Sequence, residues 1–234
     1  MSVSERERPF FLSGVAEAPC LFAVCDGMGG EDCGEVASLT AVETLAEHSR
    51  DILAKETDRA VYDFVTDANR KLCAIMMKQS LRMGTTLVMA RIDDETFKLY
   101  NLGDSRGYRV EGGRLVRSTD DHTMAEDKVR MGLITPAKAE KDRDRHVLTR
   151  YLGVFDDEMT AAPDVNGPYY FDKNRKILLC SDGLTEMLDY SEIAAIMTKP
   201  CEVSETVNNL VEAALAHGGR DNVTCVVIEI LKGD

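Results

Sequence analysis

Residues 22–30 read FAVCDGMGG, an apolar run that ends at Asp26 and continues into three glycines within four positions. The apolar run is typical of a β-strand. A turn alone needs only one or two glycines, so the stretch either closes a loop or holds something close to the backbone. The rest of the chain decides between these two interpretations, because similar stretches occur elsewhere in it.

Three more stretches place an aspartate beside glycine or asparagine where an apolar strand begins or ends: LYNLGDSRGY (99–108), ILLCSDGLTEM (177–187) and GGRDNVTCVVI (218–228). Their aspartates are Asp104, Asp182 and Asp221. Taken singly, each is a common turn signal. At one sheet edge, however, two carboxylates 4 Å apart would repel by about 4 kcal/mol in an effective dielectric near 20. The repeated pattern therefore predicts a bound divalent cation, which removes this repulsion.

The type of donor atom narrows the choice of ion. Carboxylate oxygens without a nearby His or Cys favour a hard cation, Mg²⁺ or Mn²⁺, over zinc or copper. Glycines beside the aspartates allow backbone carbonyls and water to approach the ion. A structural calcium protein is the third alternative, but the sequence lacks the ligand spacing of an EF-hand.

The remaining sequence predicts grouped helices and strands. Helical spacing of apolar residues covers 36–46, 61–75 and, near the C-terminus, 191–197 and 204–217. Short β-compatible runs fill 85–118 and read as an antiparallel meander, and two more strands are expected at 176–180 and 222–230. The polar segment at about 122–168 is interpreted as a surface flap. Because the elements are grouped rather than strictly alternating, we expect an α+β fold in one domain, 1–234.

Composition and charge exclude several functional classes. The 234 residues are 44% hydrophobic and 29% charged, as in ordinary globular proteins, and no run of about 18 apolar residues, lipidation motif or signal segment is found. A cytoplasmic monomer is the default expectation. Seven cysteines without a C-x-x-C pair suggest buried thiols rather than disulfides or zinc. The net charge of −13 argues against nucleic acid or an anionic membrane as partner.

Seven motifs resemble, in order, those of the metal-dependent PP2C-type (PPM) Ser/Thr protein phosphatases, and most closely the bacterial form with DGMGG. They are FAVCDGMGG, MGTTL (83–87), NLGDSRGY (101–108), TDDHT (119–123), LTRYLG (148–153), LLCSDGL (178–184) and GGRDNVT (218–224). The resemblance covers nearly the whole chain. It implies a central sandwich of two antiparallel sheets, a pair of helices on each outer face, and a flap beside the catalytic edge.

The resemblance also implies a reaction and a set of ligands. The activity would be hydrolysis of phosphoserine and phosphothreonine proteins by a metal-activated water, with two Mn²⁺ or Mg²⁺ ions and a possible third. Asp26 would bridge two ions, the Gly27 carbonyl would bind one through water, and Asp182 and Asp221 would complete the first site. Asp104 matches the position linked to a third, weaker ion. Substrates of a Ser/Thr kinase are the expected partners.

The N-terminus and the first motif depart from the family pattern. Glu7 stands where a second-metal glutamate is expected, but Arg8 follows it instead of an aspartate. The family's phosphate-binding arginine has no match, so either that strand is missing or Arg6 or Arg8 substitutes. This departure leaves open a second interpretation, a catalytically weak or inactive PP2C-like binding module. Met28 stands where animal members have a histidine, His122 and His146 are only weak candidates for the general acid, and no general acid is assigned.

Overall fold

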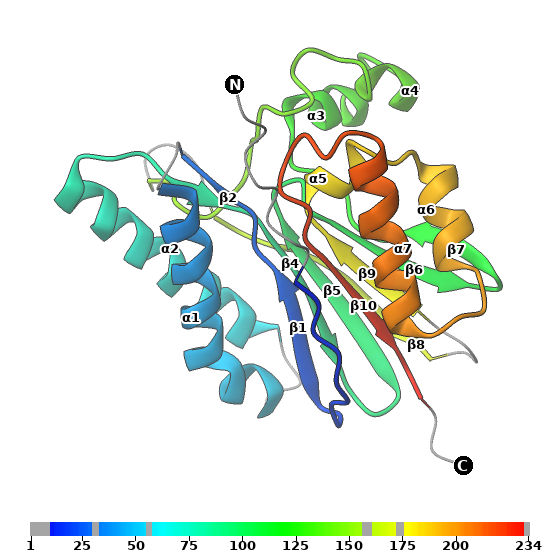
Figure 1. Cartoon of the computed structure of the whole chain (residues 1–234). Coiled ribbons are helices and arrows are strands. Elements are labelled where there is room, and N and C mark those ends of the chain that lie inside the picture. Colours follow the sequence, from blue (N-terminus) through cyan, green and yellow to red (C-terminus); the bar gives the residue numbers. More distant parts are fainter. Residues whose placement is uncertain (1–9, 30–32, 55–57, 156–160, 172–175, 232–234) are drawn as a thin grey trace, which may run out of the picture.

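The computed structural model describes residues 10–29, 33–54, 58–155, 161–171 and 176–231. Two four-stranded antiparallel sheets pack face to face, and helices cover both outer faces (Figure 1). This arrangement confirms the expected α+β sandwich flanked by helices.

Each sheet combines strands from both halves of the chain. The first has the order β1 (Cys20–Val24), β4 (Leu87–Ile92), β5 (Thr96–Leu102) and β8 (Asp164–Tyr170). The second has the order β10 (Cys225–Glu229), β9 (Lys176–Cys180), β6 (Arg106–Glu111) and β7 (Arg114–Arg117). Alternate residues of both sheets fill the space between them, namely Val24, Val88, Ala90, Leu99, Ile177, Leu179 and Ile228.

Two further apolar clusters attach the helices. On the first sheet lie α1 (Cys33–Ala54) and α2 (Arg59–Gln79), whose buried faces meet the outer face of β4 and β5. On the second lie α5 (Asp182–Thr185), α6 (Tyr190–Met197) and α7 (Val203–Ala216) (Figure 1). The apolar stripe expected at 61–75 is buried in α2, which confirms it. The stripe expected at 36–46 is wrong, because Val36, Leu39 and Val42 are exposed and α1 buries the smaller Ala37 and Ala41 instead.

The flap is shorter than the sequence suggested. It contains α3 (Met124–Arg130) and α4 (Pro136–Ala139), which lie beyond one end of the sandwich (Figure 1). The expected flap reached about 168, but Asp164–Tyr170 forms β8 and pairs with β5. Its sequence, DVNGPYY, contains Asn, Gly and Pro, which are rare in strands and hid the signal.

The expected meander is divided between the two sheets. β4 pairs with β5, and β6 pairs with β7, but β5 and β6 belong to different sheets. The chain crosses from one sheet to the other through Gly103, Asp104 and Ser105. The turn signal GDS, interpreted from sequence as a hairpin, is therefore the crossover that carries one of the predicted aspartates.

The seven cysteines are free thiols, but only Cys180 is fully buried and the other six are partly buried, so the expectation of buried thiols holds fully for Cys180 alone. Burial, followed by the charge of Asp26, raises the pKa of Cys25 to about 12. Burial likewise raises the pKa of Cys180 far above the ordinary range. Both thiols are therefore neutral and fill space beside the aspartates. Within the residues that the structure describes, none of the helices combines the length and apolar character that a bilayer-spanning segment requires.

Candidate metal centre

Asp26 follows β1 and is held by its backbone. Its N–H donates to the Thr86 hydroxyl at 3.0 Å, and its carbonyl accepts from the Thr86 N–H and from the Thr85 hydroxyl, each at 2.9 Å. The next residues form β2 (Gly27–Met28), which pairs with β3 (Gly84–Thr85). The MGTTL motif therefore fixes the strand end from which the Asp26 side chain projects.

The glycine beside Asp26 is required by a close approach of backbones. A Cβ atom at Gly27 would lie 1.9 Å from the carbonyl oxygen of Gly34, at the start of α1. A Cβ atom at Gly34 would in turn lie 2.6 Å from the Gly27 carbonyl oxygen. No side chain fits at either position, so only glycine at both positions allows the β2 turn to pack this closely against α1.

A second close approach brings the C-terminal aspartates together. Asp182 is the first residue of α5, directly after β9, and the next residue, Gly183, lies against the loop before β10. A Cβ atom at Gly183 would lie 2.2 Å from the Asn222 carbonyl oxygen. Asp221 occupies this same loop, and its carboxylate accepts a hydrogen bond from the Asn222 N–H at 2.7 Å.

The four predicted aspartates converge, because the other three all raise the pKa of Asp26. Burial, then the charge of the Asp182 carboxylate and a hydrogen bond with it, then Asp221 and Asp104, together raise the pKa of Asp26 to about 7. Residues from three other parts of the chain thus act on the Asp26 carboxyl group. The side chain of Asp221 is the most exposed of the set and lies at its rim.

Asp104 has the same electrostatic condition. Burial, then the charges of Asp182 and Asp121, raise the pKa of Asp104 to about 7, although Arg106 acts in the opposite direction. Arg106 is itself engaged by Asp121, with contacts of 2.7 Å and 3.1 Å. The cationic groups nearby therefore leave the clustered carboxylates without full compensation.

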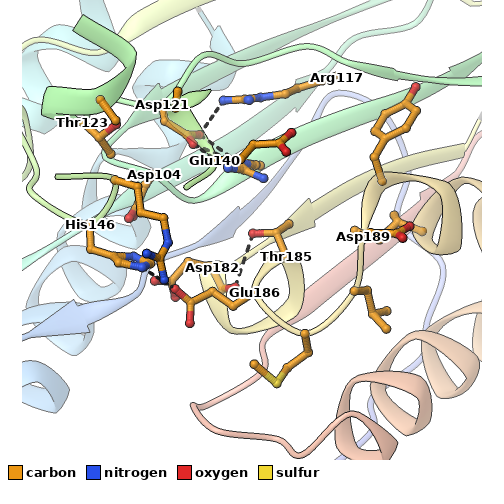
Figure 2. A pocket seen from close by; sticks show the side chains of 18 of the residues that line it. Asp104, Arg117, Asp121, Thr123, Glu140, His146, Asp182, Thr185, Glu186 and Asp189 are labelled. Atoms are coloured by element: carbon orange, nitrogen blue, oxygen red, sulfur yellow. Dashed lines mark hydrogen bonds and ion pairs between the residues drawn. The ribbon is translucent and has the colours of Figure 1, made fainter. Parts of the chain in front are cut away.

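The flap supplies a ligand candidate that the sequence did not single out. Asp104, Asp182 and His146 each offer one ligand atom, and these atoms all lie within 4.8 Å of one another. Figure 2 shows the His146 ring beside Asp182 and Glu186, below Asp104. The His146 Nε2 atom also lies 3.0 Å from a Glu186 carboxylate oxygen. The sequence indicates His146 only as a weak candidate proton donor, because nothing in the polar flap sequence predicts where this side chain lies in the folded protein.

A cleft of about 1140 Å³ opens beside this cluster. Its walls come from the flap on one side and from α5 and α6 on the other, and Asp104, Asp182 and His146 lie on its surface (Figure 2). Four arginines also line it, among them Arg145 of the flap and Arg220 of the loop before β10. The cleft is large enough for a peptide segment beside the clustered carboxylates.

The other predicted site residues are placed differently. Glu7, Arg6 and Arg8 lie outside the described residues. Met28 lies in β2, opposite Gly84. His122 is wholly buried, so it cannot give a proton to a leaving group in the cleft.

The cluster fits a hard divalent cation. Burial and the charges of neighbouring carboxylates raise the pKa values of Asp26 and Asp104 to about 7. At neutral pH the metal-free protein therefore holds either a proton or an unfavourable negative charge at these groups. A cation removes both costs. The donors are carboxylate oxygens and one imidazole, and no cysteine sulfur belongs to the cluster found among the described residues, which suits Mg²⁺ or Mn²⁺.

Comparisons with known proteins agree with this geometry. Residues 7–223 match the family described as Protein phosphatase 2C. The chain is 30% identical over 217 residues to the serine/threonine phosphatase stp of Listeria monocytogenes, covering 88% of this chain and 82% of that protein. It is 36% identical to the serine/threonine protein phosphatase PstP of Mycobacterium tuberculosis, covering 92% of this chain but 41% of PstP.

Solved structures extend the likeness to three dimensions. The crystal structure of the Mycobacterium tuberculosis phosphatase PstP/Ppp superposes with a TM-score of 0.81 at 33% identity, covering 91% of this chain and 88% of that one. A structure of the PstP catalytic domain in complex with two manganese ions has a TM-score of 0.76 at 34% identity, with coverage of 88% and 86%.

Proposed function

The chain belongs to the protein phosphatase 2C family, and we propose that the Asp26, Asp104, Asp182 and Asp221 cluster is its active centre. It is a metal-dependent protein serine/threonine phosphatase rather than a non-catalytic binding module. The observation that carries the assignment of the centre is geometric: one ligand atom each of Asp104, Asp182 and His146 lies within 4.8 Å of the others on the surface of the cleft. The pKa of Asp104, raised to about 7 by burial and by the charge of Asp182, supports it. Such perturbed groups in a cleft are typical of functional sites.

The proposed ligands follow from the position of each group. Asp26 lies where the charges of the other three aspartates meet, so it is the candidate to bridge two Mn²⁺ or Mg²⁺ ions. Asp182 and Asp221, with the Gly27 carbonyl through water, would complete the first site. Asp104, Asp182 and His146 are the candidates for a third ion. Bound divalent ions would activate water and offset the charge of a phosphate monoester.

The chain itself would orient and accommodate the substrate. The cleft between the flap and α6 would hold the polypeptide on either side of the phosphorylated residue. Arg145 and Arg220 line that cleft and would favour a phosphate dianion over a neutral side chain. Arg6 and Arg8, the phosphate-binding candidates from sequence, and Glu7, a candidate metal ligand, stay predictions.

The assay that tests this centre measures release of phosphate from a phosphothreonine peptide. Chelation, or substitution Asp182→Asn, is expected to lower kcat by about 100-fold or more, a loss comparable to removing one key electrostatic group. The matched control is Asp51→Asn, an exposed aspartate on α1. Turnover that persists in the chelator and in Asp182→Asn would contradict the assignment.

The wider biological role is also proposed. Phosphorylated Ser/Thr proteins are the substrates, and those made by a Ser/Thr kinase are the natural candidates. A single domain over 1–234, a monomeric state and a cytoplasmic location stay predictions. Because the chain spans 41% of PstP, any activity of the remaining part of that relative does not transfer to it.

A further inference from the structure

The ring of His122 lies wholly buried behind the Asp104 turn. The Gly103 N–H donates to the His122 Nδ1 atom at 3.1 Å, and the His122 N–H donates to the Gly103 carbonyl oxygen at 2.9 Å. The residue before Asp104 is thus held by His122 through both its amide and its carbonyl.

The opposite side of the ring reaches the base of the flap. The His122 Nε2 atom lies 3.1 Å from an Asp164 carboxylate oxygen. Arg150 holds that same carboxylate with two guanidinium nitrogens, at 2.6 Å and 3.2 Å. The Thr149 N–H donates to the His122 carbonyl oxygen at 2.8 Å. His122 therefore connects the Asp104 turn to the point where the flap returns to the sandwich.

The hydrogen bonds define the tautomer of the ring. A backbone N–H can only donate, so Nδ1 accepts and carries no proton. Nε2 then carries the proton and donates to Asp164. Burial is the largest influence on the ring and lowers the pKa of His122, against the opposing effect of Asp164. A neutral ring with this tautomer satisfies both partners.

The turn is also confined from the other side. Gly103 has φ of +107°, and a Cβ atom there would lie 2.7 Å from the Thr86 Cγ2 atom. The turn therefore packs directly on Thr86 and is held in place by His122. Loss of the His122 acceptor would leave the buried Gly103 N–H without its partner. The turn would then be less fixed, and the Asp104 carboxylate would move with it.

We infer that His122 is a positioning residue for the cation site of Asp104, Asp182 and His146. Its ring fixes the turn that carries Asp104 by accepting from the Gly103 N–H, and its contact with Asp164 holds the tautomer in which Nδ1 is the acceptor. The inference rests on the proposed function for the identity of the ion. Residues that orient metal ligands in this way typically change metal affinity by about 10- to 100-fold when they are replaced.

Two substitutions distinguish the two hydrogen bonds of the ring, the one that Nδ1 accepts from Gly103 and the one that Nε2 donates to Asp164. In His122→Asn the amide oxygen takes a position close to that of Nδ1, so the acceptor for Gly103 is kept. In His122→Gln the amide nitrogen takes a position close to that of Nε2, so the donor for Asp164 is kept instead. The matched control is His48→Asn, a half-buried histidine whose Nε2 lies 3.2 Å from Asp67, remote from the centre.

The test measures Mn²⁺ binding to the apoprotein by calorimetry and by electron paramagnetic resonance. His122→Gln is expected to weaken the most weakly bound ion by about 10- to 100-fold, whereas His122→Asn and His48→Asn keep affinities close to wild type. Amide hydrogen exchange of residues 103–105 in the metal-free protein gives an independent readout, and exchange should accelerate only in His122→Gln. Thermal melts identify any variant that fails to fold.

The outcomes separate this inference from the proposed function. Equal loss of affinity in His122→Asn and His122→Gln, at equal melting temperature, would mean that the ring serves packing alone and would overturn the inference. Unchanged affinity in both would overturn it as well. If wild-type protein binds Mn²⁺ but releases no phosphate from a phosphopeptide, the proposed function fails while the positioning role of His122 stands.

Discussion

The Thr86 hydroxyl oxygen lies 2.6 Å from the Ser105 hydroxyl oxygen, and this contact joins two of the clustered aspartates. The same Thr86 oxygen accepts a hydrogen bond from the Asp26 N–H at 3.0 Å, and either hydroxyl can be the donor in the contact with Ser105. Ser105 directly follows Asp104 at the crossover between the sheets. One hydroxyl group thus sets the relative position of Asp26 and Asp104.

We expect Thr86→Val to test this link. Valine keeps the shape of threonine but leaves the Asp26 N–H and the Ser105 hydroxyl without their partner. The free energy of unfolding should fall by about 1–3 kcal/mol, the usual cost of an unsatisfied buried group. Urea denaturation of the metal-free protein measures this loss, and Mn²⁺ titration should show weaker binding in parallel.

The control for Thr86→Val is Thr66→Val on the exposed face of α2. The Thr66 hydroxyl donates only to the Tyr62 carbonyl oxygen at 2.8 Å within the helix. Its replacement should change the free energy of unfolding by less than about 0.5 kcal/mol, as is usual for surface sites. A similar loss in both variants would argue against a special role for Thr86.

Gly183→Ala is expected to move the loop that carries Asp221. The new methyl group would lie 2.2 Å from the Asn222 carbonyl oxygen, and backbone must shift to relieve this contact. Overpacking of this kind typically costs about 1–3 kcal/mol. Gly14→Ala is the control, because no atom lies within 4 Å of the added carbon. Retention of full stability and full Mn²⁺ affinity in Gly183→Ala would contradict the packing described for this loop.

The metal-free protein should lose stability as the pH rises from about 4 to about 7. Burial and the charge of Asp182 raise the pKa of Asp26 to about 7, from 3.8 in the unfolded chain. The folded state then holds a proton that the unfolded state releases, so stability falls as the pH increases between these values. In the presence of EDTA, Asp26→Asn should be more stable than wild type at pH 8 but not at pH 4.

Urea midpoints of the two proteins at both pH values measure this difference, and other titrating groups cancel in the comparison. Asp51→Asn, exposed on α1, is the control and should show no pH-dependent gain. Saturating Mn²⁺ should reverse the order at pH 8, because only the wild-type carboxylate binds the ion. An Asp26→Asn variant that gains nothing at pH 8 would mean that the charges of this cluster are already compensated.

The sequence predicted the aspartates because each depends on a local pattern. Asp26, Asp104, Asp182 and Asp221 all stand where an apolar strand begins or ends beside a small or turn-forming residue, and such ends gather at one edge of the sandwich. The structure adds a reason for the glycine that the sequence did not indicate. Gly27 accommodates the backbone of α1, not only the approach of an ion.

Elements defined by long-range pairing were not predictable in this way. β8 is a strand because β5 offers it an edge, although its own residues disfavour strands. The separation of β5 from β6 depends on which sheet buries each apolar face, and local pattern contains no information about it. His146 reaches Asp104 and Asp182 only because the flap folds back, so its place is a property of the tertiary structure.

The last prediction concerns this flap histidine. We expect His146→Ala to remove one ligand of the cation site formed with Asp104 and Asp182 and to weaken its Mn²⁺ binding by at least about tenfold. Ions held by Asp26 should be affected less, since the flap does not contribute to them. Calorimetric titration with Mn²⁺ resolves the two classes by stoichiometry and affinity.

Two variants separate ligation from the other contacts of the flap. Glu186→Gln removes the carboxylate charge 3.0 Å from the His146 Nε2 atom but keeps the imidazole, so the ion should still bind. His217→Ala removes another histidine of the cleft, whose Nδ1 atom lies 2.8 Å from the Met187 carbonyl oxygen, and Mn²⁺ binding should not change. If Glu186→Gln weakens the ion as much as His146→Ala does, the ion pair rather than the imidazole lone pair supports the site, and His146 acts by fixing the flap.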